Sequence, residues 1–127
     1  MNKNIVIKGL SLIFLAIILG AFGAHKLKEI LSITELASFN TGVRYQMYGG
    51  FFLLILGLNS DNFLFSIKKI ANIYFIGVIL FSLSIYLLTV INIQNINKLI
   101  GPITPIGGLL MIVSVGILLY KLIFSKN

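Results

Sequence analysis

The stretch Ile33–Leu58, ITELASFNTGVRYQMYGGFFLLILGL, decides whether the chain folds with three long apolar helices or with four. Its purely apolar run begins only at Gly49 and is too short to cross a bilayer core of about 30 Å, which takes ~20 helical residues. Ser32 and Glu35 form a capping-box pattern, in which each side chain satisfies a free backbone N–H at a helix start. The sequence therefore predicts one helix over 33–58, with a membrane span at about 39–58 and its first turns in or above the headgroups.

Three further stretches, Ile5–Ala24, Ile70–Ile91 and Ile103–Phe124, are long enough to span a bilayer, and their charged residues, Lys8 and Lys121, lie near an end. The whole chain is 58% hydrophobic and 10% charged, with a mean hydropathy of +1.06. Soluble domains are roughly 45–50% apolar and 25% charged. We therefore expect an all-α membrane protein: one domain, 1–127, of four transmembrane helices packed as a small bundle, with a short interfacial segment between helices 1 and 2.

The basic residues favour one orientation of these helices. An even number of spans places both termini on the same side of the membrane. That side collects six lysines and the other side four basic residues, so the positive-inside rule predicts cytoplasmic termini. The two groups are Lys3, Lys8, Lys68, Lys69, Lys121 and Lys126 against Lys26, Lys28, Arg44 and Lys98.

A secretory signal peptide is the alternative interpretation of the first apolar stretch. Lys3 and Lys8 would form its basic region, and Ala21-Phe22-Gly23 resembles a small-residue cleavage site. The stretch is long for a signal peptide, and three more apolar stretches follow it instead of a secreted domain. Both observations favour a membrane span.

Small residues predict where the helices pack, because helix contacts in lipid depend on close backbone approach. The first helix gathers small residues on one face, and we expect this face to meet the glycine face of the second helix. Gln46 lies on that glycine face, where a buried amide needs an interhelical partner. A glycine contact face also follows Pro102 and Pro105 at the start of the last helix. The helix-packing candidates are Gly20, Ala24, Gly42, Gly49, Gly50, Gly57 and Gly108.

Arg44 is the main candidate for binding a ligand. A helical rotation of 100° per residue places Ala37, Asn40, Thr41 and Tyr48 on the same stripe of the second helix. An ionisable residue at membrane depth is a functional candidate, whereas an arginine near the boundary can instead extend to lipid phosphates. The candidate ligand-binding residues are Arg44, His25, Gln46, Tyr48, Asn40 and Thr41.

Few residues of this chain could carry catalysis. The sequence has no cysteine and a single histidine, His25, which could respond to protons or simply cap a helix. The acids Glu29, Glu35 and Asp61 all fall in connecting segments, which argues against a proton-coupled antiporter with an embedded carboxylate. We expect no enzyme activity, metal or cofactor. Because the basic residues are scattered, anionic lipids are better partners than nucleic acid.

Three motifs carry a resemblance to a known family. They are GAFGAH at 20–25, FNTGVRYQMY at 39–48 and GPITPIGG at 101–108. In this order and spacing they resemble the domain-of-unknown-function family 423, and the resemblance covers nearly the whole chain. It implies a four-helix protein of the bacterial cytoplasmic membrane, and some members are associated with envelope integrity. Gly49 stands where the family commonly carries histidine, and the tryptophan usual in the last helix is missing.

These features lead to two functional hypotheses. The first is a non-catalytic protein that supports membrane or envelope integrity, or stabilises a membrane-protein partner or a homo-oligomer, through its glycine faces and the segment from His25 to Arg44. The second is a module that binds or transports an anionic lipid or small solute at Arg44.

Overall fold

The structure is a computed structural model that describes residues 1–91 and 94–125. Four long helices form it: α1 (Lys3–Phe22), α3 (Ile33–Leu58), α4 (Lys68–Val90) and α6 (Ile103–Phe124). Four short helices join them: the π-helix η1 (Gly23–Leu27), α2 (Lys28–Ile30), the 3-10 helix η2 (Ser60–Asn62) and α5 (Gln94–Ile100). The described residues contain no strand. The predicted all-α membrane fold with four long helices is confirmed.

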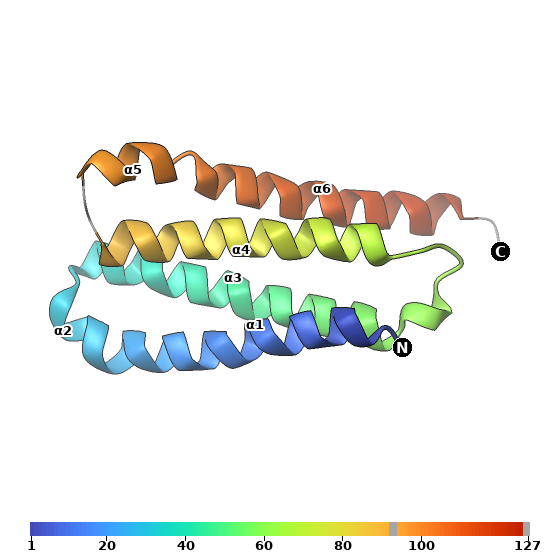
Figure 1. Ribbon diagram of the computed structural model, residues 1–127, viewed down its shortest axis with the longest axis horizontal. Helices are drawn as coiled ribbons and strands as arrows, with labels where there is room; N and C mark the ends of the chain where they lie inside the picture. Colours follow the sequence, from blue (N-terminus) through green and yellow to red (C-terminus); the bar gives the residue numbers. More distant parts are fainter. Residues whose placement is uncertain (92–93, 126–127) are drawn as a thin grey trace.

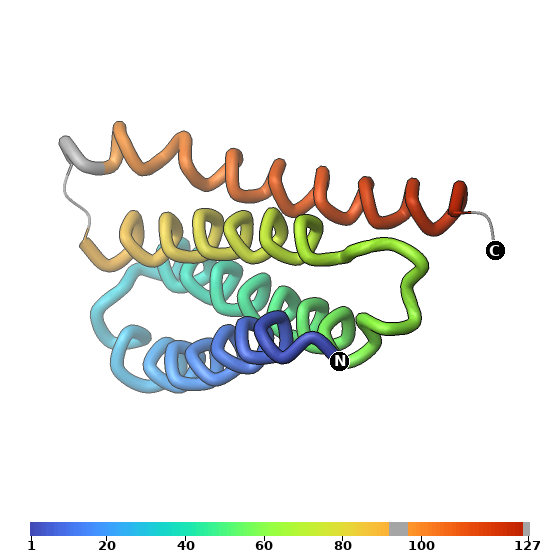
Figure 2. Tube along the Cα trace, turned by 45° about the vertical axis from the view of Figure 1, so that its right-hand side comes forward, coloured from blue at the N-terminus to red at the C-terminus, as the bar shows by residue number. Residues whose placement is uncertain are grey.

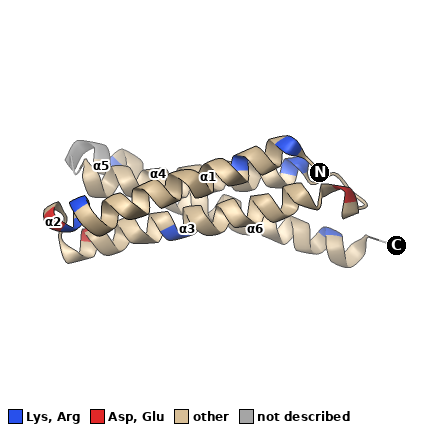
Figure 3. Cartoon of the chain, turned by 90° about the horizontal axis from the view of Figure 1, so that it is seen from below, with Lys and Arg blue, Asp and Glu red and all other residues tan. Residues whose placement is uncertain are grey.

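The long helices run antiparallel along the chain, and each packs mainly beside the next (Figure 1). α3 lies against both α1 and α4, and α6 packs against α4. The start of α1 and the end of α6 lie at the same end as η2, whereas α2 and α5 lie at the opposite end (Figure 2). We call these the terminal end and the far end. Lysines or arginines lie at both ends, with α3 also carrying one along its length (Figure 3).

α3 begins at the cap that its sequence specifies. The Ser32 hydroxyl accepts a hydrogen bond from the Glu35 N–H at 3.3 Å, and the Glu35 carboxylate accepts one from the Ser32 N–H at 2.9 Å. The Ser32 hydroxyl also donates to this carboxylate at 2.9 Å. The bond from the Ser32 N–H, and after it the bond from the Ser32 hydroxyl, lower the pKa of the Glu35 carboxyl. The helix therefore starts outside the apolar region and enters it as one continuous rod.

Three helical stretches are long and apolar enough to cross a membrane: Lys3–Ile30, Lys68–Val90 and Asn97–Phe124. The first runs through η1 and α2, so this helix continues beyond Ala24, the predicted end of the span. α3 lies outside this set because its first half is polar. Its 26 residues are nevertheless about 39 Å long, and it packs between α1 and α4. α3 therefore lies beside two helices that are long and apolar enough to cross a membrane.

Glycines bring the helices into backbone contact. A β-carbon at Gly9 in α1 would lie 2.7 Å from the carbonyl oxygen of Gly50 and the amide nitrogen of Leu54, both in α3. A β-carbon at Gly107 in α6 would lie 2.4 Å from the amide nitrogen of Phe81 in α4. Neither interface has room for a larger residue. Close backbone approach at small residues is typical of helices that pack in lipid.

The predicted single glycine face of α3 is in fact two faces. Gly42 and Gly49 face α4, where added β-carbons would meet Tyr86 at 2.8 Å and Val78 at 2.6 Å. Gly50 and Gly57 face α1, where β-carbons would meet Ile13 at 2.5 Å and Val6 at 2.8 Å. A spacing of seven residues keeps a side chain on the same face, whereas a spacing of eight rotates it by about 80°. The prediction that all four meet the first helix is therefore wrong.

Three other packing candidates, Gly20, Gly108 and Ala24, do not lie at tight helix contacts. A β-carbon at Gly20 would approach one Val43 methyl at 3.5 Å, and one at Gly108 would lie 3.6 Å from the Phe81 ring. Both distances are ordinary van der Waals contacts. Ala24 is exposed. The tight contact of α6 is at Gly107, one residue before the predicted glycine.

Candidate functional site

Gln46 joins three helices at the middle of the fold. Its side chain is 5% exposed, and its amide Nε2 donates a 3.0 Å hydrogen bond to the carbonyl oxygen of Leu12 in α1. Its Oε1 accepts a 2.7 Å bond from the hydroxyl of Tyr86 in α4. The sequence predicts an interhelical partner for this buried amide, and the structure provides two, Leu12 and Tyr86.

Ser82 extends this arrangement by one turn of α4. Its hydroxyl donates a 2.8 Å hydrogen bond to the carbonyl oxygen of Gly42, and its side chain is 2% exposed. We call Gln46, Tyr86 and Ser82, with the carbonyls of Leu12 and Gly42, the central polar cluster. Among the described residues, no buried side-chain nitrogen or oxygen lacks a hydrogen-bond partner. The cluster is therefore a closed set of donors and acceptors.

An apolar groove between α1 and α4 lies over the central polar cluster. A cavity of about 210 Å³ is lined by Gln46, Ser82 and Tyr86 together with apolar side chains such as Leu15 and Ile79. A second cavity of about 370 Å³ continues toward the far end and shares two of these lining residues, Leu19 and Tyr86. The groove suits an apolar chain better than a soluble polar molecule.

Arg44 lies away from the central polar cluster. Its side chain is exposed, as are those of Asn40 and Tyr48. Two residues along a helix correspond to a rotation of about 200°, so Arg44 and Gln46 occupy nearly opposite sides of α3. Thr41 is half-buried, and its hydroxyl donates to the carbonyl of Ala37 at 3.0 Å. The ligand-binding candidates therefore divide between the interior and the outer surface.

The depth of Arg44 follows from the neighbours of Gly42. Gly42 packs against Tyr86, so Arg44 lies roughly 10 Å along the axis from the far end of α4, at 1.5 Å per residue. An arginine side chain can extend most of this distance toward the headgroups. Of the two interpretations of Arg44, a guanidinium directed to lipid phosphate fits an exposed side chain, and a site inside the bundle does not.

His25 lies at the far end, in the wide turn where α1 continues as η1. Its side chain is exposed, and it lines a shallow cavity of about 250 Å³ with Ala21, Phe22 and Lys26. A β-carbon at Gly23 would lie 3.1 Å from the Phe39 ring, so a larger residue where this turn meets α3 would require the ring to shift by a few tenths of an ångström. Within the described residues no three His, Asp or Glu side chains gather in a way that could hold a metal.

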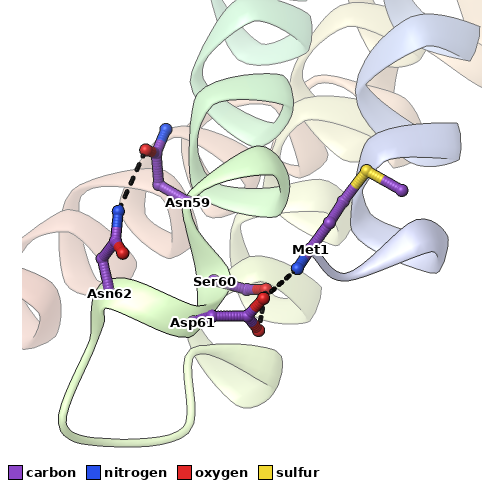
Figure 4. Close-up of polar contacts among 5 residues, drawn as sticks. All are labelled: Met1, Asn59, Ser60, Asp61 and Asn62. Atoms are coloured by element: carbon purple, nitrogen blue, oxygen red, sulfur yellow. Dashed lines mark hydrogen bonds and ion pairs between the residues drawn. The ribbon is translucent and has the colours of Figure 1, made fainter.

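At the terminal end, the first residue is tied to the η2 loop. The Met1 ammonium donates to the Asp61 carboxylate, which also accepts a 3.1 Å bond from the Ser60 hydroxyl (Figure 4). The ammonium contributes most to lowering the pKa of Asp61, and Ser60 adds to the effect. Asn62 donates a 3.3 Å bond to Asn59 and closes the same loop.

Sequence reasoning identified Gln46 but missed Tyr86 and Ser82. Both lie within the apolar run of α4. Hydroxyl groups that recur at each turn of an apolar helix indicate bonds to neighbouring helices, because hydroxyls inside a membrane bond across helices. The same reasoning missed Ser84 and Thr104, whose hydroxyls lie 2.6 Å apart between α4 and α6. Lys126 lies outside the described residues.

Comparison with known proteins finds relatives that are called membrane proteins. The family described as Protein of unknown function (DUF423) matches residues 19–108. A UPF0382 membrane protein of Staphylococcus saprophyticus is 38% identical over 111 residues, which cover 87% of this chain and 89% of that protein. The UPF0382 membrane protein YwdK of Bacillus subtilis is 36% identical over 114 residues, or 88% and 89% of the two chains. No solved structure matches. The chain therefore belongs to the DUF423 family of membrane proteins.

Proposed function

We propose that this protein is a non-catalytic component of the bacterial cytoplasmic membrane that supports membrane integrity through its outer surface. One observation carries the proposal: the buried polar side chains of the described residues bond to one another or to the backbone. Such an interior stabilises a fold but offers no free group to a substrate. The outward faces of the helices are instead rich in large apolar side chains, such as Phe14, Ile112 and Leu119.

A contact with a second copy or with a membrane-protein partner would use these outer faces. Gly50 is unsuited to that role, because it packs on Gly9 and Ile13 of its own chain. Gly20 is half-buried with only one loose neighbour and is the better candidate for contact with another chain.

The test is a deletion of the gene in its own host. Uptake of propidium iodide after a mild detergent challenge reports membrane damage. We expect the deletion strain to take up more dye and the wild-type gene to restore the barrier. A variant with both Gln46→Leu and Tyr86→Phe, matched to wild type for the amount of protein in the membrane, should restore it as well. Dye uptake equal in deletion and parent strains would overturn the proposal, as would a folded double variant that fails.

A second candidate function is the binding of an anionic lipid at Arg44. It is favoured by the exposed position of this guanidinium and by its depth, which allows contact with phosphate. Native mass spectrometry should show weaker retention of phosphatidylglycerol by Arg44→Gln than by wild type, with Lys98→Gln as the control that removes another exposed charge at the same end. Equal retention by Arg44→Gln and wild type would contradict it.

A further inference from the structure

We propose that a groove between α4 and α6 at the terminal end binds one anionic phospholipid, with Lys69 and Lys121 on its phosphate. The groove encloses about 310 Å³. We call it the terminal groove, and the residues that line it are Ser66, Lys69, Ile70, Ile73, Ile117 and Lys121. The site is separate from Arg44, which lies toward the other end of the molecule, and it does not depend on the role proposed for membrane integrity.

The terminal groove changes from charged to apolar along its length. Ser66 precedes α4, Lys69 lies in the first turn of α4, and Lys121 lies in the last turn of α6. Ile73 and Ile117 lie one turn farther from these ends, toward the middle of the membrane. A phospholipid has the same order of parts, because its anionic phosphate lies at the interface and its acyl chains extend into the hydrocarbon.

The charge of the terminal groove is uncompensated within the described residues. Neither Lys69 nor Lys121 forms an ion pair there, because the acid of this end, Asp61, binds the Met1 ammonium. Lys121 is half-buried, with its Nζ 5.1 Å from the centre of the Phe65 ring. The ring holds a cation beside the groove without neutralising it. An anion is therefore the complementary ligand.

The first turn of α4 adds to this preference. No side chain caps the helix at Ile67, so its first N–H groups keep their partial positive charge beside Lys69. Two lysines from different helices and a helix start thus act on the same space. The isoleucine walls below them select a lipid over a soluble anion, because a free phosphate would leave the apolar part of the groove unfilled.

Native mass spectrometry of the purified full-length protein tests this site. The probes are phosphatidylglycerol and phosphatidylethanolamine with identical acyl chains. We expect wild type to retain phosphatidylglycerol preferentially, and the double variant Lys69→Gln/Lys121→Gln to lose roughly tenfold of this preference. The control Lys26→Gln/Lys28→Gln removes the same charge from exposed positions at the far end and should keep the wild-type preference.

Three results would overturn the proposal. The first is an unchanged lipid preference in Lys69→Gln/Lys121→Gln, and the second is an equal loss in the far-end control, which would indicate only a general effect of charge. The third is displacement of phosphatidylglycerol by an excess of glycerol phosphate, which would show that the apolar walls add nothing. Lys26, Lys28 and Lys69 are exposed and Lys121 is half-buried. Far-ultraviolet circular dichroism with thermal melting verifies that each variant is folded.

Discussion

The amide oxygen of Gln46 in α3 accepts a 2.7 Å hydrogen bond from the hydroxyl of Tyr86 in α4. The same amide donates to the carbonyl of Leu12 in α1, so one side chain connects the three helices of the central polar cluster. In hydrocarbon an unpaired amide has no water to bond with, and each such contact also fixes the rotation of a helix about its axis. The pair therefore specifies which faces of α3 and α4 meet.

We expect Gln46 and Tyr86 to be energetically coupled. Gln46→Leu should destabilise the fold by about 1–2 kcal/mol, and Tyr86→Phe by about 0.6–1.7 kcal/mol, as for hydrogen bonds between membrane helices. The double variant should lose less than the sum, because the second change removes a bond that is already broken. Unfolding in mixed micelles by sodium dodecyl sulfate measures all four proteins. Strict additivity would show that the bond contributes nothing.

Adjacent glycines in α6 should respond differently to alanine. At Gly107 the new β-carbon would lie 2.4 Å from the Phe81 backbone nitrogen, so α4 and α6 must separate, at a cost of about 1–3 kcal/mol. At Gly108 the nearest atom is a Phe81 ring carbon at 3.6 Å, and Gly108→Ala should leave stability unchanged within about 0.5 kcal/mol. The same unfolding assay compares the two. Equal effects at both positions would contradict the close packing of α4 on α6.

The contact between Met1 and Asp61 should open in acid. The pKa of Asp61 is lower in the folded protein than its ordinary value near 4, so its ion pair stabilises the fold above that pH. The stabilisation is lost as the pH falls through the lower, folded value. Below about pH 4, amide hydrogen exchange at the start of α1 should therefore become faster relative to the intrinsic exchange rate at the same pH.

Asp61→Asn is the control for this effect. Its first turn of α1 should already exchange faster at pH 6, and it should show no additional acid-dependent opening. Identical exchange in wild type and Asp61→Asn across this range would rule out a role for the pair in holding the N-terminus.

The bounds of α3 and the pairing of Gln46 follow from local rules. The capping box of Ser32 and Glu35 lies within one helical turn, and a buried amide needs a partner wherever it lies. Three of the four long helices follow likewise from apolar length, whereas α3 follows from its cap. These parts of the fold are readable from the sequence because each depends on residues that are close in the chain or on the solvent alone.

The assignment of faces is not readable in the same way. Gly49 and Gly50 are neighbours, yet one packs on α4 and the other on α1, since a helix surrounded by two partners uses two faces. The stripe around Arg44 is polar, but its distance from the central polar cluster depends on where α4 lies. The terminal groove is lined by residues of α4 and α6 that lie about 50 positions apart in the sequence. Helical periodicity relates residues within one helix and does not predict contacts between helices that far apart.

We predict that α3 crosses the membrane, and the chain allows a direct test because its sequence contains no cysteine. Single cysteines at Ser32 and Ser60, which flank α3, can be treated in intact cells with a membrane-impermeant maleimide. We predict labelling of Ser32→Cys from outside and labelling of Ser60→Cys only after the cells are opened. Labelling of both positions from the same side would contradict a fourth transmembrane helix.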